Sequence, residues 1–137
     1  MTSIRTVAGA AALTCILALT AVQAHAAASD YRFELVGKPR LAAKKDIVQI
    51  RLVRVADGKP VQDAVIFESK ADMGPAGMET MTAPVKAMPP KAMPPKGGIY
   101  SFEIEPGMAG TWALHLAAKV QGEAETVRGT VNADLVK

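Results

Sequence analysis

The sequence predicts an all-β domain, an antiparallel β-sandwich, behind an N-terminal export signal. Three observations predict this fold: apolar and polar residues alternate in short segments, turn residues separate the segments, and no sustained 3.6-residue period follows residue 28. The segments are 31–35, 48–52, 64–68, 100–104, 112–116 and 127–135. Their spacing of roughly ten residues is typical of a sandwich, with a small closed barrel as the alternative.

Alternation also predicts which side chains enter the core. In the best segments every second residue is apolar and its neighbours are polar or small, so one face of each strand packs inward. The side chains expected in the core are Val48, Ile50, Leu52, Tyr100, Phe102, Ile104, Trp112, Leu114 and Leu116. Asp57-Gly58 and Pro106-Gly107 supply turns after two of the strands.

Residues 1–28 have the pattern of a cleaved signal peptide. Arg5 is followed by an apolar run over 7–22, and small residues then surround His25. The run is shorter than the roughly 20 residues of a membrane-spanning helix. We therefore expect export to the periplasm, with an uncleaved membrane anchor as the alternative, and one domain over residues 29–137.

Composition excludes several classes of site. The one cysteine, Cys15, lies in the predicted signal peptide, so the exported domain has no disulfide and no thiolate ligand. Without Arg5, the 16 basic residues become 15 against 13 acidic ones, a net charge of +2 with mixed signs along the chain. We expect no nucleic-acid partner. No catalytic motif occurs, so we expect no enzyme.

Residues 73–98 interrupt the strand pattern. This segment is rich in Pro, Gly, Ala and Met, and it contains the Lys-Ala-Met-Pro-Pro sequence twice in tandem, at 86–90 and 91–95. Paired prolines favour an extended backbone that cannot donate ladder hydrogen bonds. We expect one long excursion between two strands, because loops of this length are usually functional or disordered.

Methionines concentrate in this excursion and supply the chemical clue. Five of the chain's seven methionines lie there, and Met108 lies in a later turn. Thioether sulfur is a soft, neutral ligand that suits Cu(I), and by the same softness Ag(I). Met73 and Met78 flank a Gly-Pro-Ala-Gly turn, and Met81 follows three residues later. We expect these three methionines to bind the metal, with Met108 or His115 completing the site.

Other interpretations of the same residues remain open. Met88 and Met93 are five residues apart in polyproline-like backbone, which separates them by about 15 Å, so we do not expect them to share one ion. The methionines could instead cover an apolar end of the sandwich or contact a partner protein, and the proline repeat could be a stiff linker. His115 should lie on the outer face of its strand, where a histidine is usually only solvated.

Four short stretches resemble the YtkA-like/FixH-like family of bacterial exported proteins. The stretches are Ala64-Val65-Ile66-Phe67, Asp72-Met73-Gly74-Pro75-Ala76-Gly77-Met78, Gly98-Ile99-Tyr100-Ser101-Phe102 and Met108-Ala109-Gly110-Thr111-Trp112. The resemblance covers about 31–137 and implies an immunoglobulin-like sandwich of about seven strands. Met73, Met78 and Met108 match family positions, whereas the Lys-Ala-Met-Pro-Pro repeat does not. FixH-like members keep a membrane anchor, and this N-terminus looks cleavable.

The resemblance also implies a role in copper and heavy-metal handling outside the cytoplasm. We therefore expect a periplasmic accessory protein that binds Cu(I) or Ag(I) and serves a membrane transporter or the assembly of a copper oxidase. The alternative is an immunoglobulin-like protein-interaction module that uses the Pro/Met-rich segment as its contact surface. If Met73, Met78 and Met81 converge at one rim of the sandwich, metal binding is favoured. If they point apart or into the core, the protein-interaction module is favoured.

Overall fold

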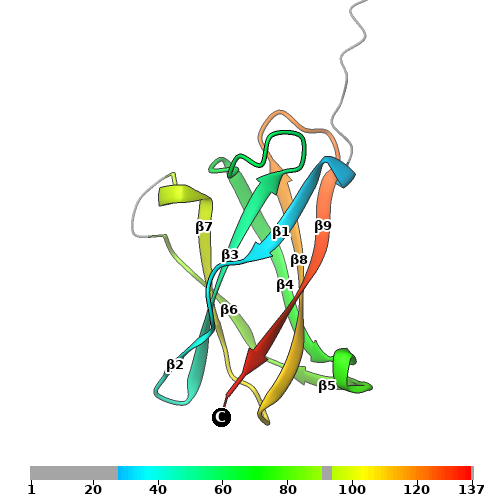
Figure 1. The fold of residues 1–137 in the computed structure, drawn as a ribbon. Helices are drawn as coiled ribbons and strands as arrows, with labels where there is room; N and C mark the ends of the chain where they lie inside the picture. Colours follow the sequence, from blue (N-terminus) through cyan, green and yellow to red (C-terminus); the bar gives the residue numbers. More distant parts are fainter. Residues whose placement is uncertain (1–27, 91–93, 137) are drawn as a thin grey trace, which may run out of the picture.

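The computed structural model describes residues 28–90 and 94–136, which form two antiparallel β-sheets packed face to face (Figure 1). The elements in chain order are η1 (Ala28–Asp30), β1 (Tyr31–Leu35), β2 (Arg40–Ala42), β3 (Lys45–Arg54), β4 (Ala64–Met73), η2 (Gly74–Ala76), β5 (Met78–Ala83), β6 (Val85–Met88), η3 (Lys96–Gly98), β7 (Ile99–Ile104), β8 (Gly110–Val120) and β9 (Thr126–Leu135). Within the described ranges, no helix is long and apolar enough to cross a membrane. The predicted signal peptide lies outside these ranges, apart from Ala28.

Strand order identifies the sandwich as immunoglobulin-like. The first sheet has the order β1-β3-β7-β6, with β2 paired beside β3, and the second has the order β5-β4-β8-β9. With β2 and β5 set aside, the remaining strands follow the two-sheet order of immunoglobulin constant-type domains. The predicted fold class is therefore confirmed, and each of the six predicted segments lies within or overlaps an observed strand.

The predicted core faces are also confirmed. Val48, Ile50 and Leu52 have no exposed surface, and Trp112 fills the space between the sheets at 1% exposure. Adjacent strands hold these faces in register, since Val48 pairs with Phe102 across β3 and β7. Gly129 on β9 allows the Phe33 ring to approach closely, because a Cβ there would lie 2.7 Å from Phe33 Cδ2.

The expectation of one continuous excursion over residues 73–98 is wrong for its first half. β5 pairs with the end of β4, and β6 pairs with β7 in the opposite sheet. Pro84 stands between them, where the chain crosses from one sheet to the other. These strands lack clear alternation because they are short and lie at sheet edges, where both faces are largely exposed. The segment 91–93, which includes Met93, lies outside the described residues.

A partly buried tyrosine hydroxyl links the two sheets near the start of β4. Tyr100 Oη on β7 lies 3.1 Å from the carbonyl oxygen of Ala64 and 3.2 Å from that of Val61. It also accepts a hydrogen bond from the Ala64 backbone N–H at 3.3 Å. Burial raises the pKa of the Tyr100 hydroxyl above its ordinary value. The hydroxyl thus satisfies backbone groups that no strand partner reaches.

A buried carboxylate lies at the opposite end of the sandwich. Asp46 at the start of β3 has no exposed surface. Its Oδ2 accepts the Val136 backbone N–H at 3.0 Å, whereas Oδ1 has no partner among the described residues. Burial without a cation raises the pKa of Asp46 above its ordinary value. The Asp46 side chain thus holds the chain just after β9, but burial of its negative charge destabilises the folded state.

Replacing Tyr100 with Phe should lower the free energy of unfolding by about 1–3 kcal/mol, because the backbone groups around Ala64 would lose a buried partner. Urea unfolding of the purified chain measures the change. Tyr31→Phe is the matched control: its hydroxyl donates to Glu123 Oε1, a partly exposed carboxylate that water can solvate. An equal loss in both variants would contradict the bridging role of Tyr100.

Replacing Asp46 with Asn should stabilise the protein relative to the native chain as pH rises. The folded pKa of Asp46 lies above its unfolded value, so the folded state binds the proton more tightly and its penalty is absent only in acid. The stability gained by the Asn variant should be smallest below pH 3.8 and should grow with pH until the folded pKa of Asp46 is passed. Urea midpoints of both proteins across this range test the prediction, and a difference independent of pH would contradict it.

Candidate metal-binding site

The sequence-predicted methionines gather at one end of the sandwich. β4 ends at Met73, the chain turns through η2, and β5 begins at Met78, which pairs directly with Met73. The β7–β8 turn, which carries Met108, lies at this same end (Figure 1). The Gly-Pro-Ala-Gly turn therefore brings Met73 and Met78 side by side in the ladder, but the expectation that both sulfurs lie at the mouth of the loop is wrong for Met73, which is 2% exposed. This burial is the outcome expected for the protein-interaction alternative.

Local sequence fixes the turn between these two methionines. Gly77 adopts a left-handed conformation with φ 75°, and its N–H donates to the Gly74 carbonyl at 2.8 Å. Asp72 Oδ1 accepts the Gly74 N–H at 2.8 Å, which holds the entry to the turn. Pro75 supplies the restricted φ that a tight turn favours.

The four methionines at this end differ in exposure. Met73 is only 2% exposed and belongs to the core. Its Cε lies 2.9 Å from where a Cβ of Gly110 would stand, so the absence of a side chain at Gly110 makes room for it. Met78 and Met81 are each 37% exposed, and Met108 is 39% exposed. Three thioethers therefore reach solvent, and the fourth packs beneath the surface.

Met108 is held by the core through its backbone. The Trp112 indole N–H donates to the Met108 carbonyl at 3.1 Å. Because Trp112 is buried, this bond fixes the position of the turn relative to the sandwich. The Met108 residue itself is partly exposed at the surface.

His115 lies on the outer face of the second sheet, as its alternation predicts. Its Nε2 is 2.7 Å from Asp72 Oδ2 and its Nδ1 is 3.0 Å from Thr130 Oγ1, so both ring nitrogens have partners. Asp72 and Met73 are consecutive in β4 and point to opposite faces. The structure consequently places His115 across the sheet from Met73, apart from the buried thioether.

The described residues contain no group of three or more His, Cys, Asp and Glu side chains that could hold a metal ion. Met88 is 36% exposed but lies on β6, beside the proline repeat. The elements that carry Met73, Met78, Met81 and Met108 therefore lie at one end of the sandwich, and Met88 lies on a different strand. Sequence reasoning did not identify Asp72, which orders the methionine turn, or Gly110, which accommodates Met73.

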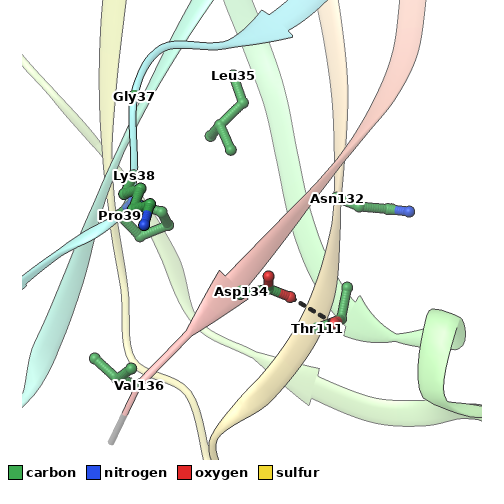
Figure 2. Close-up of a pocket in the computed structure, with 8 residues that line it drawn as sticks. All are labelled: Leu35, Gly37, Lys38, Pro39, Thr111, Asn132, Asp134 and Val136. Carbon is green, nitrogen blue, oxygen red and sulfur yellow. Dashed lines mark hydrogen bonds between the residues drawn. The ribbon is translucent and has the colours of Figure 1, made fainter.

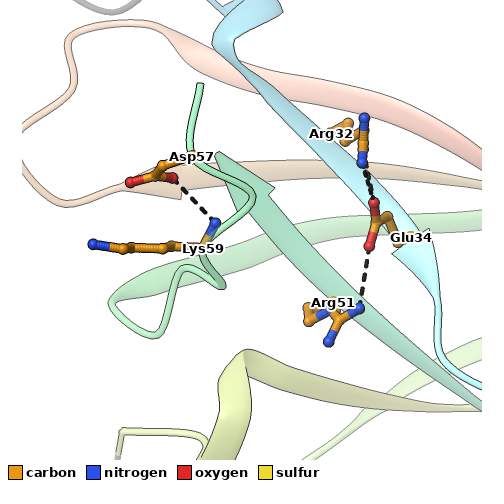
Figure 3. A network of polar contacts seen from close by, with 5 residues as sticks. All are labelled: Arg32, Glu34, Arg51, Asp57 and Lys59. Carbon is orange, nitrogen blue, oxygen red and sulfur yellow. Dashed lines mark hydrogen bonds and ion pairs between the residues drawn. The ribbon is translucent and has the colours of Figure 1, made fainter. Parts of the chain in front are cut away.

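Two further polar regions have their own internal partners. A hollow of about 540 Å³ lies between the β1–β2 connection and β9, and on its lining Thr111 Oγ1 donates to Asp134 Oδ1 at 2.6 Å (Figure 2). On the first sheet, Glu34 accepts hydrogen bonds from Arg32 and Arg51 (Figure 3). These bonds, led by that from Arg32, lower the pKa of Glu34. Neither region presents a set of soft ligands.

Comparisons with known proteins support the fold. A family model described as YtkA-like matches residues 25–117. A DUF4426 family protein from Pseudomonas aeruginosa PAO1 has a similar structure, with a TM-score of 0.51, 14% identity, and coverage of 77% of this chain and 88% of that one. The Lin-41 filamin domain is less similar, with a TM-score of 0.37, 17% identity, and coverage of 74% and 89%. No curated protein matches the chain.

Exposure predicts the order in which the methionines oxidise. Dilute hydrogen peroxide should convert Met78, Met81 and Met108 to sulfoxides before Met73, because oxidation follows the accessibility of the thioether. Peptide mass spectrometry of samples taken over time measures each position. In urea the four rates should become similar. Early oxidation of Met73 in the folded protein would contradict its burial.

Proposed function

The chain belongs to the YtkA-like family, and we propose that it is a periplasmic accessory protein that binds Cu(I) or Ag(I) as exchangeable cargo. One observation carries the proposal: β5, which contains Met78 and Met81, and the β7–β8 turn, which contains Met108, lie at one end of the sandwich, and each of these residues is more than a third exposed. Methionine is usually a core filler, so three exposed methionines at one end suggest a chemical use.

The chemistry of the donor set fits a soft monovalent ion. Thioethers are neutral and polarisable, and they select Cu(I) over hard divalent cations. Residues 29–137 contain no cysteine, so no thiolate would hold the ion more firmly. A site of this kind favours exchange with another protein over permanent retention. That behaviour suits a carrier or buffer for a membrane transporter or for copper-oxidase assembly.

The proposed ligands differ in their readiness to bind. Met78, Met81 and Met108 reach solvent in the folded chain. Met73 would join them only by turning its side chain out of the core, and His115 only by leaving its bonds to Asp72 and Thr130. We therefore assign the primary ligand role to the three exposed methionines, with Met73 supporting their turn from beneath.

A Cu(I) competition titration tests the proposal. The purified chain is titrated against a colorimetric Cu(I) chelator under anaerobic reducing conditions, beside a variant in which Met78, Met81 and Met108 are all changed to Ile. The native chain should compete stoichiometrically, and the variant should not. Isoleucine keeps apolar bulk without sulfur, so folding should be retained, and circular dichroism checks this.

Met88→Ile is the matched control, because Met88 has nearly the same exposure but lies on β6. It should compete for Cu(I) as well as the native chain does. Equal losses in the control and the triple variant would place the site elsewhere. No competition by the native chain would overturn the proposal.

A further inference from the structure

β5 contains an irregularity that changes which of its side chains share a face. Thr82 pairs with Asp72 at the end of a regular antiparallel stretch. The next regular pair would join Met81 to Met73, but Met73 pairs with Met78 instead. Within the described residues, the three residues between Met78 and Thr82 therefore form a bulge that has no partner on β4.

The bulge places both methionines of β5 on the inner face of the sheet. Side chains of directly paired residues lie on the same face, so Met78 shares the face of the buried Met73. Ala83 is also buried, and alternation along the strand from Ala83 returns Met81 to this face. In a regular strand, a separation of three residues would place Met78 and Met81 on opposite faces.

The carboxylate between these methionines lies on the outer face. Glu79 lines a hollow of about 590 Å³ together with Asp72 and His115. Its Cγ lies 3.4 Å from where a Cβ of Gly74 would stand, which places Glu79 beside the turn. Among the described residues that line this hollow there is no methionine. Oxygen donors and the histidine therefore lie on one face of the sheet, and the thioethers of β5 lie on the other.

The β7–β8 turn meets the inner face. The chain leaves the first sheet after Ile104 and enters the second at Gly110, so this turn crosses the end of the space between the sheets. Gly110 lies against Met73, since a Cβ there would be 2.9 Å from Met73 Cε. Met108 stands two residues before Gly110. The turn therefore carries Met108 on the side of the second sheet on which Met73 lies.

We propose that this bulge sets the metal specificity of the site. It turns Met78 and Met81 to one face and Glu79 to the other, so that an ion bound at this end meets neutral thioethers and no carboxylate from β5. A carboxylate in the ligand set would favour harder divalent ions, because oxygen donors suit them better than they suit Cu(I). This role rests on the Cu(I) or Ag(I) binding proposed above.

Exchanging two adjacent donors tests the role of the bulge. The double variant Met78→Glu, Glu79→Met keeps composition, net charge and chain length, and both positions are exposed, so folding should be retained. It should compete for Cu(I) about tenfold more weakly than the native chain, because one thioether moves to the outer face and a carboxylate takes its place. Circular dichroism checks the fold.

Glu79→Met alone is the matched control, because it adds a thioether between the two methionines and removes none. It should compete for Cu(I) as the native chain does, since the added sulfur lies on the outer face. Equal competition by the native chain and the exchange variant would overturn the proposal. A gain of about tenfold or more in the control would also overturn it, because the number of methionines and not their face would then determine binding.

The two faces can be observed without metal. Methionine labelled with ¹³C at its methyl group gives one NMR signal per residue, and single Met→Ile variants assign the signals. Nuclear Overhauser contacts should join the methyl groups of Met73 and Met78, which are paired across the strands. None should join Met78 or Met81 to the His115 ring. Such a contact to His115 would overturn the assignment of the faces.

Ag(I) titration of the labelled chain separates the specificity role from metal binding itself. The signals of Met78, Met81 and Met108 should shift together, and the signal that Glu79→Met introduces should not shift. If no native signal shifts and the native chain does not compete for Cu(I), the proposed function fails and the specificity role fails with it. If the native signals shift and the introduced signal shifts equally, metal binding stands and the role of the bulge is overturned.

Discussion

The crossover at Pro84 determines the layout of this molecule. β5 pairs with β4 over only a few residues before the chain passes to the other sheet as β6. Pro84 cannot donate to a ladder, and its carbonyl accepts the Glu105 N–H at 3.2 Å, which ties the crossover to the end of β7. Among the described residues, this early crossover leaves one edge of β4 unpaired over 64–70, while β8 pairs with the other edge, and it confines β5 to the end that carries the methionines.

Buried packing and hydrogen bonds lie beneath the exposed methionines at that end. Met73 occupies the space that Gly110 leaves open, and Trp112 fixes the Met108 backbone from within the core. Asp72 joins this support to the outer face, because one carboxylate oxygen holds the Gly74 N–H and the other contacts His115. Met78 and Met108 thus extend from backbone that is held at several points.

The sequence predicts the parts of the fold that bury one complete face. Val48, Ile50 and Leu52 predict their strand, because burial of one face of a strand produces an alternation of apolar and polar residues in the sequence. β5 and β6 bury few of their side chains, so their formation depends on backbone pairing with β4 and β7. The local sequence of β5 and β6 does not reveal this pairing. The Met73–Met78 turn was readable from Gly and Pro. The burial of Met73 was not, since it depends on Gly110 across the sheet.

β4 separates the methionine end of the sandwich from an apolar groove beside β6. Among the described residues, one edge of β4 has no ladder partner over 64–70, and this stretch precedes Met73. The groove, of about 540 Å³, lies on the side of β6 that carries Met88. β5 and the β7–β8 turn, which carry the other exposed methionines, lie at the far end of β4. The early crossover at Pro84 produces this separation, because β5 pairs with β4 only at that end.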